Sequence, residues 1–253
     1  MPFTLSHAAA VLPLRRTRLP WAALVIGSFG PDFEYFLRIN YTSRAWHYYP
    51  DLLLFCLPFT IFAYYLFHGV IKEPVTGLLP DSFQERIRFE DPYPRSLAAF
   101  AWLLAALGIG IATHVAWDSV THAYSWPWRH FAILRKLLYK SHFTGWVYGF
   151  ELAQTLSTTI GLLIVLWCLL RWYRRTPANA AARRMLPTWV RWSICTTLVV
   201  VAFAAAEYTA RLRMHPKDFD FPQLLVISSM SWFMWGVMGY SAIMVLRARF
   251  ALR

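Results

Sequence analysis

The residues best suited to chemistry lie in the segment His114-Val-Ala-Trp-Asp118-Ser-Val-Thr-His122. Two histidines and an aspartate recur there every four residues, so on an α-helix they form one stripe that drifts by about 40° per step. A histidine and a carboxylate one turn apart can bind one metal ion from the same helix face. The segment ends an apolar run of membrane length, residues 97–117. Ionisable groups are costly in such a run and therefore indicate a functional site.

His114 and Asp118 are the strongest pair in this stripe. An imidazole nitrogen and a carboxylate oxygen suit zinc or another divalent ion. The alternative is a structural, hydrogen-bonded pair at a helix end. His122 lies two further turns, roughly 12 Å, along the axis from His114. We therefore expect His122 to contact the substrate or the ligands, and not to bind the same ion.

Asp32 is the best partner for that pair, because it follows Pro31 in a glycine-flanked helix break. A carboxylate at membrane depth needs a compensating group, so Asp32 is predicted to be a metal ligand or a general base. The alternative is a cap on a following short helix. Glu34 is the weaker carboxylate, either a second candidate for the catalytic base or a residue facing water.

His7 is a further candidate metal ligand because of the predicted fold of the N-terminal segment. Residues 1–37 contain two short helical stretches separated by a basic turn, which favours a helical hairpin. The open ends of the hairpin would place His7 near Asp32, and the metal-site hypothesis therefore includes both. His47, in Arg44-Ala-Trp-His47, has three possible roles: metal ligation, phosphate binding together with Arg44, or a place in the interfacial aromatic belt.

The elements that must position these residues are membrane helices. The chain is 58% hydrophobic and only 15% charged, whereas a soluble domain is typically about a quarter charged. We predict an all-α, polytopic helical bundle that forms a single integral-membrane domain over residues 1–253. Its elements are the N-terminal hairpin, residues 1–37, and five candidate transmembrane helices at residues 52–71, 97–117, 150–170, 190–206 and 225–246.

The formal net charge of +12 would indicate nucleic-acid binding in a soluble protein. Here the cations lie mostly between the apolar runs, and the arginines of residues 171–191 predict a cytoplasmic loop. Nucleic acid is therefore not an expected partner. Counting spans from that loop places the His/Asp residues together at the outer face. Four cations in residues 119–149 favour the opposite face, so the side stays open.

Three stretches resemble a family of bacterial membrane proteins, domain-of-unknown-function family 4184. They are Met-Pro-Phe-Thr-Leu-Ser-His7-Ala-Ala-Ala, Val25-Ile-Gly-Ser-Phe-Gly-Pro-Asp-Phe-Glu34 and Thr113-His-Val-Ala-Trp-Asp118-Ser-Val-Thr-His. That family is distantly similar to membrane-bound metal-dependent hydrolases, the inner-membrane YdjM-like proteins. Those carry Gly-His, Pro-Asp-x-Asp, His-Arg-Gly-x-Thr-His-Ser and Ser-His-x-x-x-Asp motifs.

The resemblance can be carried over residue by residue. His7 matches the Gly-His histidine, Asp32 the first aspartate of Pro-Asp-x-Asp, and His114 with Asp118 the late pair. Glu34 stands where the second aspartate would be. The middle motif departs from the pattern, because Arg44-Ala-Trp-His47 has one fewer intervening residue and lacks Thr-His-Ser.

Two functions follow as expectations. The first is a metal-dependent hydrolase of the bacterial inner membrane, acting on a phosphoester or lipid-linked substrate with a divalent ion such as zinc. Membrane lipids, including a lipid phosphate, are its expected partners. The second is a non-enzymatic structural or accessory protein whose buried His/Asp network stabilises helix packing. No Gly-x-Ser-x-Gly elbow, phosphate-binding loop or dinucleotide fingerprint occurs, which disfavours serine hydrolases, nucleotide hydrolases and Rossmann oxidoreductases.

Overall fold

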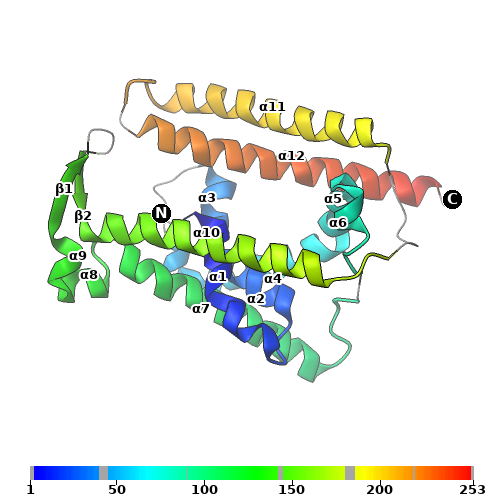
Figure 1. The fold of residues 1–253 in the computed structure, drawn as a ribbon, viewed down its shortest axis with the longest axis horizontal. Helices are drawn as coiled ribbons and strands as arrows, with labels where there is room; N and C mark the ends of the chain where they lie inside the picture. Colours follow the sequence, from blue (N-terminus) through cyan, green and yellow to red (C-terminus); the bar gives the residue numbers. More distant parts are fainter. Residues whose placement is uncertain are drawn as a thin grey trace. The chain divides into compact units, whose positions relative to one another are not determined.

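The computed structural model describes residues 3–39, 45–89, 91–141, 145–179, 186–218 and 220–251. Helices dominate these residues, and two short strands form a single hairpin (Figure 1). Five helical segments are long and apolar enough to cross a membrane. Their bounds are Leu52–Leu78, Leu97–His130, Gly149–Arg175, Thr188–Arg213 and Phe221–Phe250. The predicted fold class, an all-α membrane protein with five candidate spans, is confirmed.

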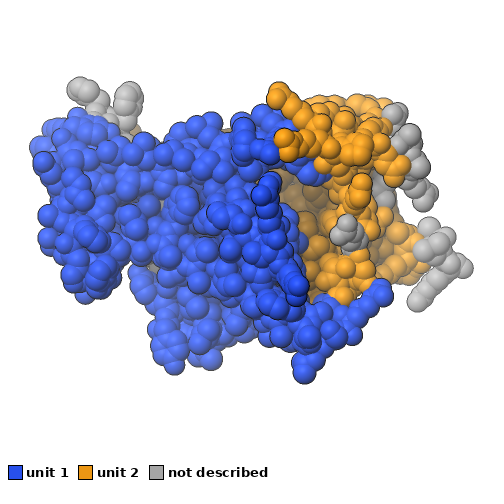
Figure 2. Space-filling view, turned by 60° about the horizontal axis from the view of Figure 1, so that its bottom comes forward, with its two compact units in different colours: residues 1–32, 46–61, 94–172 blue, residues 33–45, 62–93, 173–253 orange. Residues whose placement is uncertain are grey.

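The chain divides into two compact units, coloured blue and orange in Figure 2. Unit 1 comprises residues 1–32, 46–61 and 94–172, and unit 2 comprises residues 33–45, 62–93 and 173–253. Each unit is described separately below. The predicted single domain over the whole chain stays a prediction.

Unit 1 begins with a series of short helices. The first five are η1 (Thr4–His7), α1 (Ala8–Val11), η2 (Leu12–Arg16), α2 (Trp21–Phe29) and η3 (Gly30–Asp32). After the chain returns to this unit, η4 (Ala45–His47) and η5 (Leu52–Cys56) follow, and η5 leads into α4 (Leu57–Leu66). Pro20 precedes α2, and its fixed φ suits a position at a helix start. The segment folds back on itself, because α1 packs against both α2 and the later helix α7.

The rest of unit 1 consists of two long helices and a small connecting element. Helix α7 (Leu97–Thr121) begins at Ser96, whose side chain accepts a hydrogen bond from the backbone of Ala99. The connecting element contains α8 (Trp126–His130), α9 (Ala132–Arg135), β1 (Leu137–Ser141) and β2 (Gly145–Tyr148), and it leads into α10 (Gly149–Arg175). The strands pair antiparallel, with an irregularity between Leu137 and Tyr139.

Unit 2 is built on two long helices that pack together, α11 (Thr188–Arg213) and α12 (Phe221–Ala251). Helix α12 also contacts α3 (Phe33–Arg38), η6 (Phe67–Ile71) and α5 (Lys72–Leu78). The short helix α6 (Asp81–Gln84) follows. Ala210, Phe221 and Leu224 form a buried cluster between the helices.

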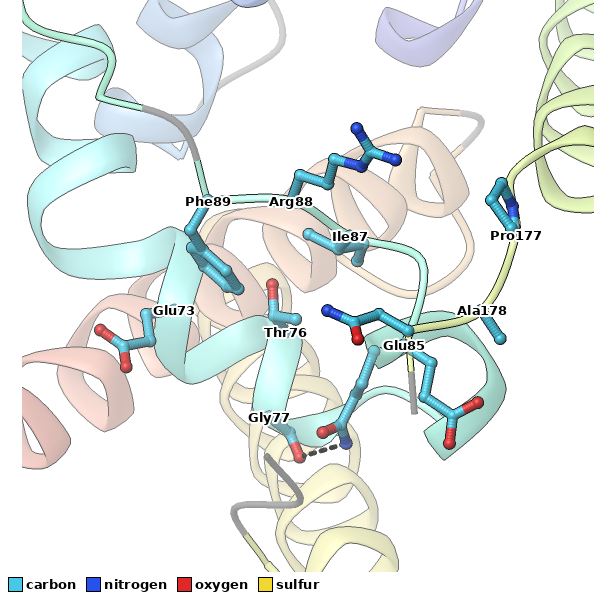
Figure 3. A pocket seen from close by; sticks show the side chains of 11 residues that line it. Glu73, Thr76, Gly77, Glu85, Ile87, Arg88, Phe89, Pro177 and Ala178 are labelled. Carbon is cyan, nitrogen blue, oxygen red and sulfur yellow. Dashed lines mark hydrogen bonds between the residues drawn. The ribbon is translucent and has the colours of Figure 1, made fainter. Parts of the chain in front are cut away.

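A cavity of about 640 Å³ lies in unit 2, and none of the predicted site residues lines it. Its floor is fixed by Gln84, whose side-chain amide donates to the carbonyls of Gly77 and Leu79, 3.2 and 2.8 Å away. Figure 3 shows the first of these bonds, and it shows the guanidinium of Arg88 extending away from the cavity. Glu73 and Arg88 are exposed, so the cavity is open to its surroundings at these residues.

Candidate metal centre

Helix α7 carries the two residues with which the site begins. His114 and Asp118 are both buried and lie one turn apart, with 3.6 Å between His114 Nε2 and Asp118 Oδ2. The i, i+4 spacing puts both side chains on the face of α7 that packs against α1, α2, η1 and η3. An imidazole and a carboxylate therefore point into the interior of unit 1.

Two glycines bring α2 close enough to α7 to orient His114. A Cβ on Gly27 would lie 2.4 Å from the carbonyl oxygen of Leu107, and one on Gly110 would lie 2.4 Å from that of Leu24. Small residues at such contacts let helix backbones approach closely. As a result, the carbonyl oxygen of Ser28 lies 2.7 Å from Nδ1 of His114.

This contact determines which nitrogen of His114 faces the site. When Nδ1–H donates to the Ser28 carbonyl, the lone pair of the neutral ring lies on Nε2. Metal-binding histidines usually donate their second ring N–H to a carbonyl or carboxylate in this way. His114 therefore presents Nε2 to the other polar side chains.

His7 enters from η1, which is held against α7 and α10. The backbone N–H of Phe3 donates to Thr158 Oγ1 on α10 at 3.1 Å, and a Cβ on Gly161 would lie 2.7 Å from Cβ of Ser6. The His7 ring stacks on the His114 ring with centroids 3.8 Å apart, and its Nε2 lies 3.5 Å from Asp118 Oδ1. The N-terminal segment thus adds an imidazole on the Oδ1 side of Asp118.

Asp32 lies in η3, immediately after the helix break at Gly30 and Pro31. Its Oδ2 accepts a hydrogen bond from the hydroxyl of Thr4 at 2.6 Å, and its Oδ1 lies 3.5 Å from His114 Nε2. One carboxylate oxygen is therefore held by Thr4 while the other faces the histidines.

His47 lies at the centre of the group. Its Nε2 is 3.3 Å from His114 Nε2, 3.7 Å from Asp32 Oδ1 and 3.6 Å from Asp118 Oδ2. The adjacent Trp46 ring packs on Phe59, 5.3 Å between centroids, which anchors η4 to the first candidate span. From the sequence alone, ligation was one of three interpretations of His47, and the structure places it among the predicted ligands.

Two sets of three side chains have the spacing of ligands around one ion: His7, His114 and Asp118, and Asp32, His47 and His114. Five separations join the Nε2 atoms of His47 and His114 to each other and to the two carboxylates, and they range from 3.3 to 3.7 Å. Ligand atoms about 2.0–2.2 Å from a tetrahedral zinc would be about 3.3–3.6 Å apart. Most of these separations exceed a normal hydrogen bond, and all five are close to this ligand spacing.

The protonation states of the two ligands outside the spans favour cation binding. Burial, reinforced by the charge of His114, lowers the pKa of His7 to about 4, which leaves its ring neutral at pH 7. Burial alone would raise the pKa of Asp32, but the charge of His114 and a polar interaction with His47 outweigh it and hold that pKa below the usual value. A neutral imidazole and an ionised carboxylate are the forms that bind metal.

Several atoms of the cluster are buried without a hydrogen bond. Neither ring nitrogen of His7 nor Oδ1 of Asp32 has a hydrogen-bond partner among the residues that the structure describes. Buried polar atoms are rarely left so, because each costs about 1–3 kcal/mol. His7, His114 and Asp118 form one group of potential ligands, and Asp32, His47 and His114 form another. In each group the potential ligand atoms lie within 4.8 Å of one another.

The comparison with known families gives one match. The model of a family described as a domain of unknown function, DUF4184, matches residues 1–243. The chain belongs to this family. No curated protein and no solved structure matches it. The predicted resemblance to DUF4184 is confirmed, whereas the more distant similarity to metal-dependent hydrolases stays a prediction.

His122 lies at the edge of the cluster in this DUF4184 member. Helix α7 ends at Thr121, and His122 has an extended backbone, so the helical stripe expected from the sequence stops one residue earlier. Its Nδ1 lies 2.9 Å from the carbonyl oxygen of Asp118 and 3.6 Å from Oδ2 of the same residue. The His122 side chain is 12% exposed, against 0–2% for His7, His47 and His114, but its Nε2 is buried.

The two remaining predicted residues are Glu34 and Arg44. Glu34 lies on α3 in unit 2, where its buried carboxylate binds Nε of Arg38 at 3.1 Å. Its proposed role as a base stays a prediction. Arg44 lies outside the described residues.

Sequence reasoning missed two contributors to the site. Thr4, which binds Asp32, and the backbone carbonyl of Ser28, which orients His114, have no motif of their own. Thr4 has one available signal, its place three residues before His7 at a helix start. The role of the Ser28 carbonyl depends entirely on how closely α2 approaches α7.

Proposed function

We propose that the buried cluster of His7, Asp32, His47, His114 and Asp118 binds a divalent metal ion. The observation that carries the proposal is a set of five separations of 3.3–3.7 Å, which join the Nε2 atoms of His47 and His114 to each other and to one oxygen each of Asp32 and Asp118. Nitrogen and oxygen donors at tetrahedral spacing suit zinc, which is the ion we propose. The hydrogen bonds from His114 to Ser28 and from Thr4 to Asp32 would hold the first ligands in place.

The reaction that this centre supports best is hydrolysis of a phosphoester. A divalent ion bound by three of these side chains, such as Asp32, His47 and His114, would keep a fourth position for a water that it activates, and it would neutralise phosphoryl oxygens. We propose that His122, at the edge of the cluster, and Arg44 contact the substrate. Because His114 and Asp118 lie on a candidate span, the substrate class we propose is a lipid-linked phosphate at the surface of a bacterial inner membrane.

The first test is metal content. Protein purified in detergent without chelator is expected to contain about one divalent ion per chain by elemental mass spectrometry. The His114→Ala/Asp118→Ala variant is expected to lose it, whereas His130→Ala, which removes an exposed histidine stacked on Trp126, is expected to retain it. Equal metal content in the double variant and the wild type would rule out the centre.

The second test separates binding from hydrolysis. The metal-loaded protein is assayed for phosphate release from a soluble phosphomonoester, a soluble phosphodiester and a lipid phosphate in mixed micelles. We expect turnover of the lipid phosphate that disappears in His114→Ala/Asp118→Ala and survives in His130→Ala. If the protein binds metal stoichiometrically but hydrolyses none of the three substrates, the proposed metal centre stands and the proposed hydrolase function is rejected.

A structural role is the second candidate, and two observations favour it. Hydrogen bonds of 2.6 and 2.7 Å, from Thr4 to Asp32 and from His114 to Ser28, join segments far apart in the chain. If the cluster serves only packing, Asp118→Asn would lower the melting temperature equally in the presence and absence of a chelator. If it binds metal, chelation would lower the melting temperature of the wild type and leave that of Asp118→Asn unchanged.

A further inference from the structure

The element between α7 and α10 forms a distinct surface in unit 1. It comprises α8, α9, β1 and β2, and we refer to residues 124–141 and 145–148 as the basic aromatic cap. In Figure 1 its four elements lie together at one end of α10. Helices α7 and α10 are both part of candidate spans, so the cap connects two membrane helices at a single membrane face.

The cap is folded, with fixed ends. Ser125 caps α8 by accepting a hydrogen bond from the backbone of Trp128 at 3.2 Å. The backbone N–H of Gly149 donates to the carbonyl of Lys136 at 3.0 Å, and a Cβ on Gly149 would lie 2.0 Å from the carbonyl oxygen of Ile133. This close approach requires glycine, and it ties α9 to the start of α10.

Despite this order, the cap buries very few of its apolar side chains. Leu134 and Val147 are 8% and 7% exposed and form its interior. Nine other large apolar or aromatic side chains of the cap are substantially exposed: Tyr124, Trp126, Phe131, Ile133, Leu137, Leu138, Tyr139, Trp146 and Tyr148. Exposed apolar surface of this extent on an ordered element indicates a binding surface.

Cations are interleaved with these rings. Arg129, Arg135, Lys136 and Lys140 are exposed, and no aspartate or glutamate occurs between Asp118 and Glu151. The ammonium of Lys140 lies 5.1 Å from the ring centroid of Trp146, its partner across the strands. The cap therefore combines positive charge with interfacial side chains.

We propose that the basic aromatic cap lies on the bilayer surface and binds anionic phospholipid headgroups. Tryptophan and tyrosine side chains favour the headgroup region, and lysine and arginine beside them attract anionic lipids. The net charge of the cap is complementary to such a surface, and its position between two spans holds it there. The proposal also explains why four cations occur in this segment, although the orientation counted from the arginines of residues 171–191 would place it at the outer face. The lipid-binding proposal is independent of the metal centre.

The experiment compares lipid binding to the detergent-purified, full-length chain. Native mass spectrometry is used to titrate phosphatidylglycerol and phosphatidylcholine separately. We expect tighter binding of phosphatidylglycerol, weakened at least tenfold in Arg135→Gln/Lys136→Gln/Lys140→Gln and little changed for phosphatidylcholine. The matched control, Arg15→Gln/Arg16→Gln/Arg18→Gln, removes three exposed arginines of the same unit that have no described aromatic partner. It is expected to change phosphatidylglycerol binding less than threefold.

A second measurement needs no variant. Phosphatidylglycerol binding to the wild type is expected to weaken as salt rises from 50 to 500 mM, while phosphatidylcholine binding stays constant. If phosphatidylglycerol binding weakens equally in the two triple variants, the binding reflects the overall positive charge and not the cap, and the proposal is overturned. A wild type without preference for phosphatidylglycerol would overturn it as well. So would displacement of phosphatidylglycerol by a short oligonucleotide at equal concentration, since the surface would then suit nucleic acid.

Discussion

Two buried polar groups of the chain, one in each unit, differ in how closely their atoms approach. In unit 2, Arg191 on α11 is 6% exposed, and its guanidinium binds Asp81 Oδ1 at 2.7 Å and the carbonyl of Leu79 at 2.7 Å. In unit 1, the Nε2 and carboxylate atoms of the His/Asp cluster are 3.3–3.7 Å apart. The first group has the distances of charge-assisted hydrogen bonds, and the second has those of ligands around an ion.

The difference in distance separates a structural polar network from the metal centre that we propose. Arg191 joins α11 to the segment around Leu79 and Asp81 through guanidinium nitrogens 2.7 Å from oxygen atoms, although its Nε has no hydrogen-bond partner among the described residues. In the cluster, neither ring nitrogen of His7 has a hydrogen-bond partner among the described residues, although the ring is fully buried. A cation bound by the cluster, as we propose, would satisfy these atoms, and each prediction below tests that distinction.

The largest expected effect is on His47→Ala. Removing a central imidazole is expected to weaken zinc binding by about 100-fold or more, since even residues supporting the ligands contribute about 10–100-fold. Competition with a chromogenic chelator measures the affinity. His130→Ala is the control, because its ring is exposed and stacks on Trp126. An unchanged zinc affinity in His47→Ala would mean that the cluster, like the Arg191 network, is structural.

Arg191→Met tests the other side of the comparison. Loss of the guanidinium leaves Asp81 and the Leu79 carbonyl without this donor, and we expect the free energy of unfolding to fall by about 2 kcal/mol. Denaturation in mixed micelles measures the change. Arg211→Met, which breaks an exposed pair with Glu207 on the same helix, is expected to cost less than about 0.5 kcal/mol. Zinc content should stay at the wild-type value in both variants, and a loss of zinc in Arg191→Met would contradict the distinction.

Gly110→Ala tests whether helix approach orients the site. The added Cβ would lie 2.4 Å from the Leu24 carbonyl oxygen, so α2 must shift, at a cost of about 1–3 kcal/mol. That shift moves the Ser28 carbonyl away from His114, and zinc affinity is expected to fall by about tenfold. Gly108→Ala is the matched control on the same helix, because a Cβ there meets nothing within 4 Å. Equal zinc affinities in the two variants would mean that the Ser28 contact does not matter for binding.

The smallest expected effect is on Thr4→Val, which keeps the shape of the side chain and removes the hydroxyl that donates to Asp32. We expect zinc affinity to fall three- to tenfold while the free energy of unfolding changes by about 1 kcal/mol. Thr155→Val removes an exposed hydroxyl on α10 and is expected to change neither quantity. A large loss of stability with unchanged zinc affinity would favour the structural interpretation of the cluster.

The amino-acid sequence by itself determined the five candidate spans and indicated four of the five cluster residues. Apolar runs of about 20 residues admit few other folds, because a bilayer leaves backbone groups no partners outside a helix. The spacing of four residues between His114 and Asp118 placed both side chains on one helix face, because residues i and i+4 of an α-helix lie one above the other. Asp32 and His7 were also predicted, from a helix break and a proposed hairpin.

Only the tertiary structure decided which other groups join them. The place of His47 depends on the packing of η4, and no local period links it to α7. The roles of Thr4 and the Ser28 carbonyl arise from contacts between segments 28 and 86 residues apart. The end of α7 at Thr121, which leaves His122 outside the helix, is likewise a property of the folded chain. Helix periodicity is local and can be read along the sequence, whereas the distances between ligands depend on how closely separate helices pack.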